Sequence, residues 1–118
     1  MAELVVEVRG RADVAVIDLM GDLDGRAEVA IDAAYAEAAA DGPEAIVLNF
    51  ADVGYINSTG IALIVGVLAS ARKESIAVRA VGLTDHYRHI FEITRLADFM
   101  TFVGGEDEAI GKGMQAPA

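Results

Sequence analysis

The 118-residue sequence contains no cysteine and no tryptophan, and aromatic side chains make up only 6% of it. Without cysteine the chain has neither a disulfide framework nor thiolate chemistry, which fits a reducing compartment. Because aromatic side chains are few, the 54% hydrophobic content predicts a core of Ala, Val, Ile and Leu and argues against disorder. The length suits one domain with a real core, which we place at residues 1–112, followed by a tail at residues 113–118.

Positive charge is also scarce, with 9 Lys and Arg against 19 Asp and Glu and a net charge of −10. Most of such a surface repels a phosphate backbone, so the sequence argues against direct nucleic-acid binding and favours a basic protein partner. No window holds about 18 uninterrupted apolar residues, and the N-terminus lacks the basic and apolar regions of a signal peptide. We therefore expect no membrane span and a cytoplasmic location.

The first half of the sequence predicts a hairpin followed by a helix. Apolar residues alternate from Leu4 to Val8, and a longer β-segment runs from Val14 to Met20, so the two are expected to pair across a turn at residues 10–13. Gly21 is expected to end the second strand. From Arg26 the apolar residues take helical spacing in an alanine-rich segment, which residues 41–43, Asp-Gly-Pro, are expected to end.

The second half alternates strand and helix patterns. Residues 45–50 predict a buried central strand and residues 52–56 a loop. The later predicted elements are a helix from about residue 58 to 73, a strand at 76–81, a helix capped by Thr84, a short strand at 99–103 and a helical turn at 106–112. The order ββαβαβαβ predicts an α/β domain. Its mixed, mostly parallel sheet has four to five strands, an N-terminal antiparallel hairpin and helices packed on it.

Residues 55–60, Tyr-Ile-Asn-Ser-Thr-Gly, place hydroxyl groups where the predicted loop becomes a helix. Asn, Ser and Thr are typical of helix N-termini, because their side chains accept hydrogen bonds from the free N–H groups of the first turn. A simple cap is one interpretation of this segment. The other is a functional hydroxyl at Ser58, because a helix N-terminus stabilises an anion such as a phosphate.

The helix behind Ser58 carries apolar residues on every side. Ile61, Ile64, Val65, Leu68 and Ala71 share one face at helical spacing, and further apolar residues occupy the other sides. The pattern therefore predicts that little of this helix faces water apart from its N-terminus.

Two motifs resemble those of STAS domains, the family that includes sulfate transporters and anti-sigma factor antagonists. Residues 57–60, Asn-Ser-Thr-Gly, resemble the family's phosphorylation motif, typically Asp-Ser-Ser-Gly or Asp-Ser-Thr-Gly. Residues 19–24, Leu-Met-Gly-Asp-Leu-Asp, resemble its Leu-x-Gly-x-Leu-Asp segment. With the order of elements, the resemblance extends from Leu4 to about Ile110. The one departure is Asn57, which stands where the family usually has Asp and removes a negative charge beside the phosphoacceptor.

The resemblance implies a protein-binding switch without an active site, cofactor or metal of its own. The unphosphorylated form would bind a serine-kinase anti-sigma factor and free a sigma factor, the kinase would phosphorylate Ser58, and a metal-dependent phosphatase of the PP2C type would reverse the modification. The implied partner-binding residues are Asp22, Leu23, Asp24, Tyr55, Ile56, Asn57, Thr59 and Gly60. An alternative within the family is a scaffold or transporter-associated subunit in which Ser58 is not phosphorylated.

Both segments follow predicted strands, and α/β folds collect their sites at the carboxyl ends of strands. We therefore expect residues 22–24 to lie beside Tyr55, Ile56 and Ser58.

Catalytic and metal-binding alternatives have weaker support in the sequence. Asp22 and Asp24 match the Asp-x-Asp pair of haloacid dehalogenase-type phosphohydrolases, but such enzymes need a lysine after a later strand, and Lys73 and Lys112 do not follow one. His86 and His89, three apart on a predicted helix, lack a third ligand in pattern. Ser58 is not flanked by the glycines of a nucleophile elbow.

Overall fold

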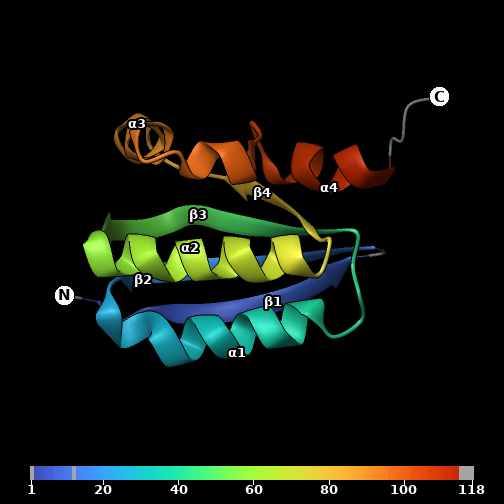
Figure 1. The fold of residues 1–118 in the computed structure, drawn as a ribbon, viewed down its shortest axis with the longest axis horizontal. Helices are drawn as coiled ribbons and strands as arrows, with labels where there is room; N and C mark the ends of the chain where they lie inside the picture. Colours follow the sequence, from blue (N-terminus) through green and yellow to red (C-terminus); the bar gives the residue numbers. More distant parts are fainter. Residues whose placement is uncertain (1, 12, 115–118) are drawn as a thin grey trace.

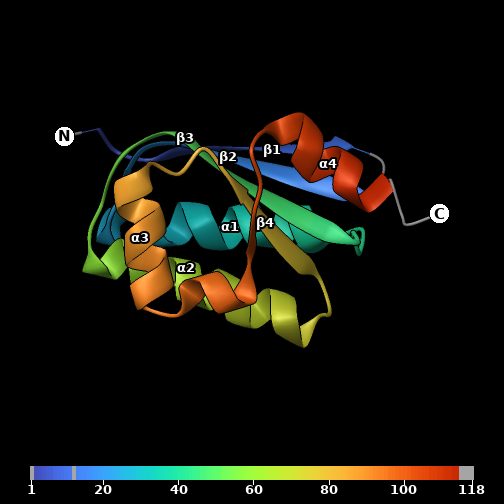
Figure 2. The ribbon, with the colours of Figure 1, turned by 90° about the horizontal axis from the view of Figure 1, so that it is seen from above.

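The computed structural model describes residues 2–11 and 13–114, in which helices cover both faces of a five-stranded sheet (Figures 1 and 2). The strands lie across the sheet in chain order: β1 (Val5–Arg11), β2 (Val14–Leu23), β3 (Ala45–Ile56), β4 (Ala77–Val81) and β5 (Thr101–Phe102). β1 and β2 are antiparallel, and every later neighbouring pair is parallel. The predicted α/β class, N-terminal hairpin and mostly parallel sheet are confirmed.

The helices divide between the two faces of the sheet. The first face is covered by α1 (Glu28–Ala39), which follows the short 3₁₀ helix η1 (Gly25–Ala27), and by α2 (Ser58–Lys73). α3 (Asp85–Ile93) and the 3₁₀ helix η2 (Leu96–Phe99) extend this cover beside β4. α4 (Glu106–Met114) packs on the opposite face (Figure 2). None of the helices within the described ranges combines the length and apolarity that crossing a membrane requires.

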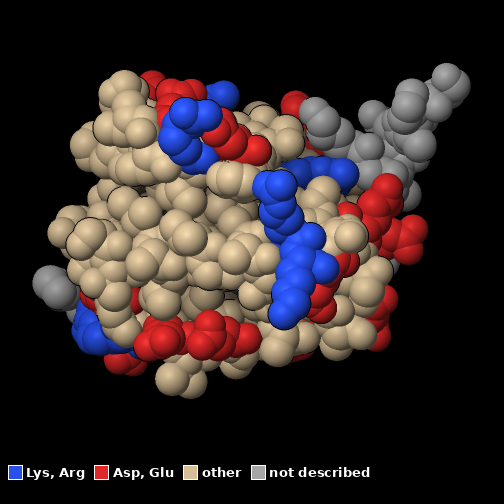
Figure 3. All heavy atoms as spheres, viewed as in Figure 1, with Lys and Arg blue, Asp and Glu red and all other residues tan. Residues whose placement is uncertain are grey.

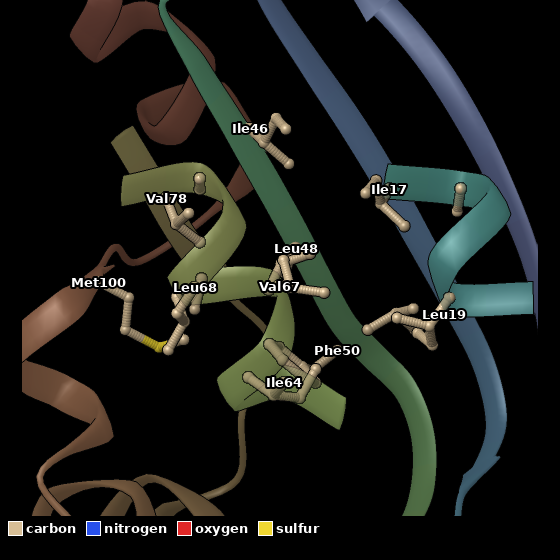
Figure 4. Packing of buried hydrophobic residues seen from close by; sticks show 14 of the residues in the cluster. Ile17, Leu19, Ile46, Leu48, Phe50, Ile64, Val67, Leu68, Val78 and Met100 are labelled. Carbon is tan, nitrogen blue, oxygen red and sulfur yellow. The ribbon is translucent and has the colours of Figure 1, made fainter. Parts of the chain in front are cut away.

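Because both faces are covered, the central strands are buried on both sides over their first halves. Residues 14–17 of β2 and 45–48 of β3 are all buried, which explains why they are continuous apolar runs instead of alternating ones. The main core lies between the strands and α2, where Leu48 and Phe50 meet Ile64, Val67 and Leu68 (Figure 4). A smaller cluster beneath α4 includes Val16, Val47 and Ala109.

The predicted ends of several strands are wrong: β1 continues into the predicted turn to Arg11, the last strand is only Thr101–Phe102 because Phe99 belongs to η2, and both strands at the candidate site run longer than predicted. β2 does not end at Gly21 but continues to Leu23, because Asp22 and Leu23 still pair with β3. Gly21 adopts a φ of +117°, which only glycine tolerates easily, within an irregular stretch of this pairing. The predicted loop at residues 52–56 is the last part of β3. The two strands therefore stay paired for several residues beyond the expected end of the sheet.

An ion-pair network ties α4 to the N-terminal hairpin. Arg9 of β1 donates to Asp18 of β2 at 2.6 Å and to Glu106 of α4 at 2.9 Å, and the amide of Asn49 on β3 donates to Asp18 at 2.9 Å. The two carboxylates raise the pKa of the Arg9 guanidinium, so this side chain is always charged. α4 continues to Met114, two residues past the predicted domain end. Of the predicted tail, residues 115–118 lie outside the described residues.

Candidate functional site

The segments at residues 22–24 and 55–60 meet at the carboxyl ends of β2 and β3. Asp22 pairs with Tyr55 and Leu23 with Ile56 in the parallel register of the two strands. The backbone N–H of Asn57 then donates to the carbonyl oxygen of Leu23 at 3.2 Å. The proximity expected from the sequence is confirmed, although these residues are strand ends and not loops.

Asn57 is the N-cap of α2. Its backbone is extended, with φ −100° and ψ −177°, and its side-chain Oδ1 accepts from the backbone N–H of Gly60 at 2.8 Å. This bond satisfies one of the free donors of the first helical turn. An aspartate at this position has the same acceptor atom, so the departure from the family motif at residue 57 preserves the cap and changes only its charge.

Ser58 is therefore not the cap. It is the first residue of α2, its side chain is exposed, and Asn57 performs the capping role that the sequence left open to either residue. Among the described residues no acceptor bonds to the backbone N–H of Ser58 or Thr59. Free N–H groups and the positive end of the helix dipole favour a negative group at this position.

Gly60 brings α2 into direct contact with the end of β2. A Cβ atom on Gly60 would lie 2.0 Å from the carbonyl oxygen of Leu23, far inside van der Waals contact. Only glycine permits this approach, which holds the start of α2, and with it Ser58, close against the strand end. The glycine of the motif thus has a packing role at this position, and its backbone N–H takes part in the cap.

Tyr87 of α3 also supports this segment, although no pattern in the sequence indicates this role. The backbone N–H of Ile56 donates to the Tyr87 hydroxyl oxygen at 3.0 Å, two residues before Ser58. The sequence placed Tyr87 only on the apolar face of its helix together with Ile90 and Phe91. Its hydroxyl links α3 to the segment that leads into Ser58, and no local pattern indicates that link because Tyr87 and Ile56 are far apart in the chain.

Asp24 is a buried carboxylate with a structural partner. Only 7% of the residue is exposed, and its side chain accepts from the backbone N–H of Arg26 at 3.0 Å and from the Arg26 guanidinium at 2.9 Å. These side-chain bonds, with the backbone bond next in importance, hold the pKa of Asp24 below its usual value. Asp24 thereby caps η1 and fixes the turn that carries the chain from β2 into α1.

Burial divides the predicted partner-binding residues into two groups. Leu23, Asp24, Ile56 and Gly60 are buried, so their side chains support the site from below. Tyr55, 49% exposed, and the exposed Ser58 and Thr59 present side chains to solvent, with Asp22 and Asn57 half-buried beside them. A partner-binding role for this set stays a prediction, and the exposed group is where a partner has access.

The side-chain contacts at this site do not support the phosphohydrolase and metal-binding alternatives. The carboxylate of Asp24 is already engaged by Arg26, so the second carboxylate of the Asp-x-Asp pair is not free for the role that it has in such phosphohydrolases. His86 and His89 are both exposed, and the His86 ring packs edge-on against Tyr87 with 5.0 Å between ring centroids. Within residues 2–11 and 13–114, no cluster of three or more His, Asp or Glu side chains is suited to hold a metal ion.

Comparison with known proteins supports the family and the fold. A sequence model of the STAS domain matches residues 5–109. The anti-sigma-B factor antagonist of Staphylococcus aureus is 37% identical over 60 residues, which make up 51% of this chain and 56% of that protein. The chain thus matches little more than half the length of this curated relative.

Solved structures with the same fold include anti-sigma factor antagonists. An anti-sigma factor antagonist from Mycobacterium paratuberculosis superposes with a TM-score of 0.79 at 21% identity, covering 93% of each chain. The Bacillus cell fate determinant SpoIIAA in its phosphorylated form superposes with a TM-score of 0.72 at 23% identity, covering 92% of this chain and 99% of that one. At these identities the likeness shows the fold.

Proposed function

Because the chain belongs to the STAS domain family, we propose that it is an anti-sigma factor antagonist, which binds an anti-sigma factor and so releases a sigma factor. The names of its relative and of its structural neighbours support this assignment, since they describe regulatory binding proteins and not enzymes. The net charge of −10 fits a protein partner better than nucleic acid. The site of action is the cytoplasm.

The switch residue is Ser58, phosphorylated by the anti-sigma factor acting as a serine kinase and restored by a phosphatase of the PP2C type. The observation that carries this proposal is that Ser58 is exposed at the start of α2 while Asn57 makes the cap. The hydroxyl is therefore accessible to a kinase, and the fold does not depend on it. If Ser58 were an ordinary N-cap, its side chain would accept the hydrogen bond from the backbone of the first helical turn, and Asn57 makes that bond instead.

Phosphorylation acts through charge. A phosphate adds about two negative charges at pH 7, and the N-terminus of α2 accommodates them without unfolding the protein. An interface formed around a neutral Ser58, Thr59 and Tyr55 must instead desolvate those charges, and without a cation to pair them this costs several kcal/mol. Because each 1.4 kcal/mol is about a tenfold change in affinity, the modified protein releases its partner.

The test uses the purified serine-kinase anti-sigma factor encoded in the same genome, with ATP. We expect phosphate on wild-type protein at Ser58, none on Ser58→Ala, and unchanged labelling of Thr59→Ala, which removes the neighbouring exposed hydroxyl as a matched control. Because Ser58 makes no cap, Ser58→Ala should change the free energy of unfolding by no more than about 0.5 kcal/mol and should still bind the partner. Ser58→Asp should fold as well as wild type but bind at least about tenfold more weakly.

Two results together would overturn the switch. They are full affinity of Ser58→Asp for the anti-sigma factor and the absence of phosphoserine at position 58 after incubation with the kinase. Binding without phosphorylation would favour the scaffold interpretation.

A further inference from the structure

The outward face of α2 carries no charge although it lies in water. The helix contains no Asp, Glu, Lys or Arg from Ser58 to Ala71, yet successive turns of it are exposed at Ala62, Val65 and Ala69. Figure 3 shows the result as an uncharged area across the middle of this view, with acidic side chains below it over α1 and basic ones near the C-terminal end of α2. In a chain with 24% charged residues, such an uncharged area is a candidate interaction surface.

This face ends in an apolar groove between α2 and η2. The groove has a volume of about 310 Å³ and is lined mainly by apolar side chains. Its lining residues are Val65, Leu68, Ala69, Arg72, Thr94, Arg95, Leu96 and Phe99. Val65 is 47% exposed and Phe99 49% exposed, so large apolar groups face solvent on both walls. The volume is at the lower limit for small-molecule pockets, which favours one or two apolar side chains as the occupant.

Arg72, at the rim of this groove, has no carboxylate partner among the described residues. The guanidinium of Arg72 lies over the Phe99 ring, 5.3 Å from its centroid, and among the described residues no Asp or Glu pairs with it. Arg95, on the other wall, is paired with Asp98 at 2.8 Å. In a chain of net charge −10, an exposed unpaired arginine beside an apolar groove is complementary to an acidic side chain next to an apolar one.

We propose that this groove is a second contact site for the anti-sigma factor, taking a segment with an apolar side chain in the groove and an acidic side chain on Arg72. The inference rests on the proposed function, and it adds the chemistry of the partner segment. Ser58 and Arg72 lie on the same side of α2, 14 residues apart, or about 21 Å along the helix. A standard interface of about 800 Å² per partner is wide enough to cover both.

The groove differs from the Ser58 site in its response to phosphorylation. Val65 is seven residues from Ser58, about 10 Å along the helix, which is close to the Debye length at physiological salt. The phosphate therefore weakens contacts at Ser58 far more than contacts in the groove. The groove contributes affinity that holds the partner near Ser58 during the kinase reaction.

The experiment measures binding of the purified anti-sigma factor by isothermal titration calorimetry, with thermal unfolding to show that each variant is folded. Val65→Glu introduces a charge into the groove and should weaken binding at least about tenfold, as burial of an unpaired charge in an interface does. The matched control is Val29→Glu on α1, where Val29 is 81% exposed and lies outside the groove. This control should change the dissociation constant by less than about twofold.

Charge at the rim gives an independent readout. Arg72→Glu places a negative charge opposite the acidic side chain of the partner and should also weaken binding about tenfold, while Arg72→Lys keeps the charge and should stay within about threefold of wild type. If Val65→Glu and Arg72→Glu bind the anti-sigma factor as tightly as wild type does, the groove inference is overturned and the proposed function remains intact. If wild type itself does not bind, the proposed function fails and the groove assignment fails with it.

Discussion

The inward and outward faces of α2 are both uncharged from Ser58 to Ala71, but the inward face carries larger aliphatic side chains and the two have opposite surroundings. Ile64, Val67 and Leu68 face the sheet and are buried among Leu48, Phe50 and their neighbours (Figure 4). Ala62, Val65 and Ala69 belong to the same uncharged stretch and face solvent. Apolar residues on the inward face stabilise the fold, whereas those on the outward face add little stability. In the proposed docking role a partner covers this outward face, so one uncharged helix serves stability on one side and binding on the other.

The largest expected effect comes from the inward face. Ile64→Ala removes a completely buried side chain at the centre of the main core and leaves a cavity between α2 and the sheet. The expected loss is about 2–5 kcal/mol in the free energy of unfolding, measured by urea denaturation. A loss below about 1 kcal/mol would show that the two faces of α2 do not differ in the way that burial indicates.

Gly60→Ala tests the contact that positions the start of the helix. The new methyl group must displace the Leu23 carbonyl, which a Cβ would approach to 2.0 Å, so the start of α2 must move away from β2. We expect about 1–3 kcal/mol of destabilisation and chemical-shift changes in the NMR spectrum at Leu23, Asn57 and Ser58. Gly66→Ala is the matched control, because a Cβ there meets nothing within 4 Å and alanine is the better helix former. Equal stability of the two variants would contradict the close approach.

Asn57→Ala and Asn57→Asp separate the cap from the charge at the helix start. Alanine removes the Oδ1 acceptor that binds the Gly60 N–H and should cost about 0.5–2 kcal/mol in thermal or chemical unfolding. Aspartate keeps an acceptor and adds a negative charge at the helix N-terminus, so it should be as stable as wild type or more so. An Asn57→Ala variant with wild-type stability would show that the cap lies elsewhere.

The smallest expected effect lies on the outward face. Val65→Ala trims a half-exposed side chain and replaces a β-branched residue with a better helix former, so the free energy of unfolding should change by no more than about 0.5 kcal/mol. Calorimetric unfolding measures this change in free energy. The difference between the values for Val65→Ala and Ile64→Ala then compares an exposed and a buried residue that are adjacent in one helix. A cost like that of Ile64→Ala would mean that Val65 belongs to the core and that the outward face is not free for a partner.

Local patterns predicted much of the fold and of the site. The alternation at residues 4–8, the apolar run at 45–50 and the Thr84 cap each agree with the observed element, because each depends on neighbours in the chain. The helix after Ser58 ends at Lys73 as expected. The extension of β2 to Leu23 and of β3 to Ile56 was missed, because the pairing of the two strands with each other sustains them beyond their apolar runs.

The local sequence pattern also did not predict which side of α2 packs against the sheet. The sequence grouped Val65 with Ile61, Ile64, Leu68 and Ala71 on a buried face, and the structure exposes Val65 and buries Val67 instead. A helix that is apolar all round has no amphipathic stripe to orient it. Its rotation is set by contacts with other elements, here the packing of Gly60 against Leu23 and of Ile64 against the sheet.

The sequence by itself determined the class of fold, the hairpin, the helix start at residues 57–60 and Ser58 as the candidate hydroxyl. The hairpin and the helix start depend on spacing and residue type over a few neighbouring positions, the fold class on the order of such segments along the chain, and the choice of Ser58 also on the family resemblance. Only the tertiary structure decided that Asn57 and not Ser58 makes the cap, that Tyr87 supports Ile56, and that α2 leaves an uncharged face and a groove beside Arg72. Those features depend on distances between segments far apart in the chain, which packing sets and local sequence does not encode.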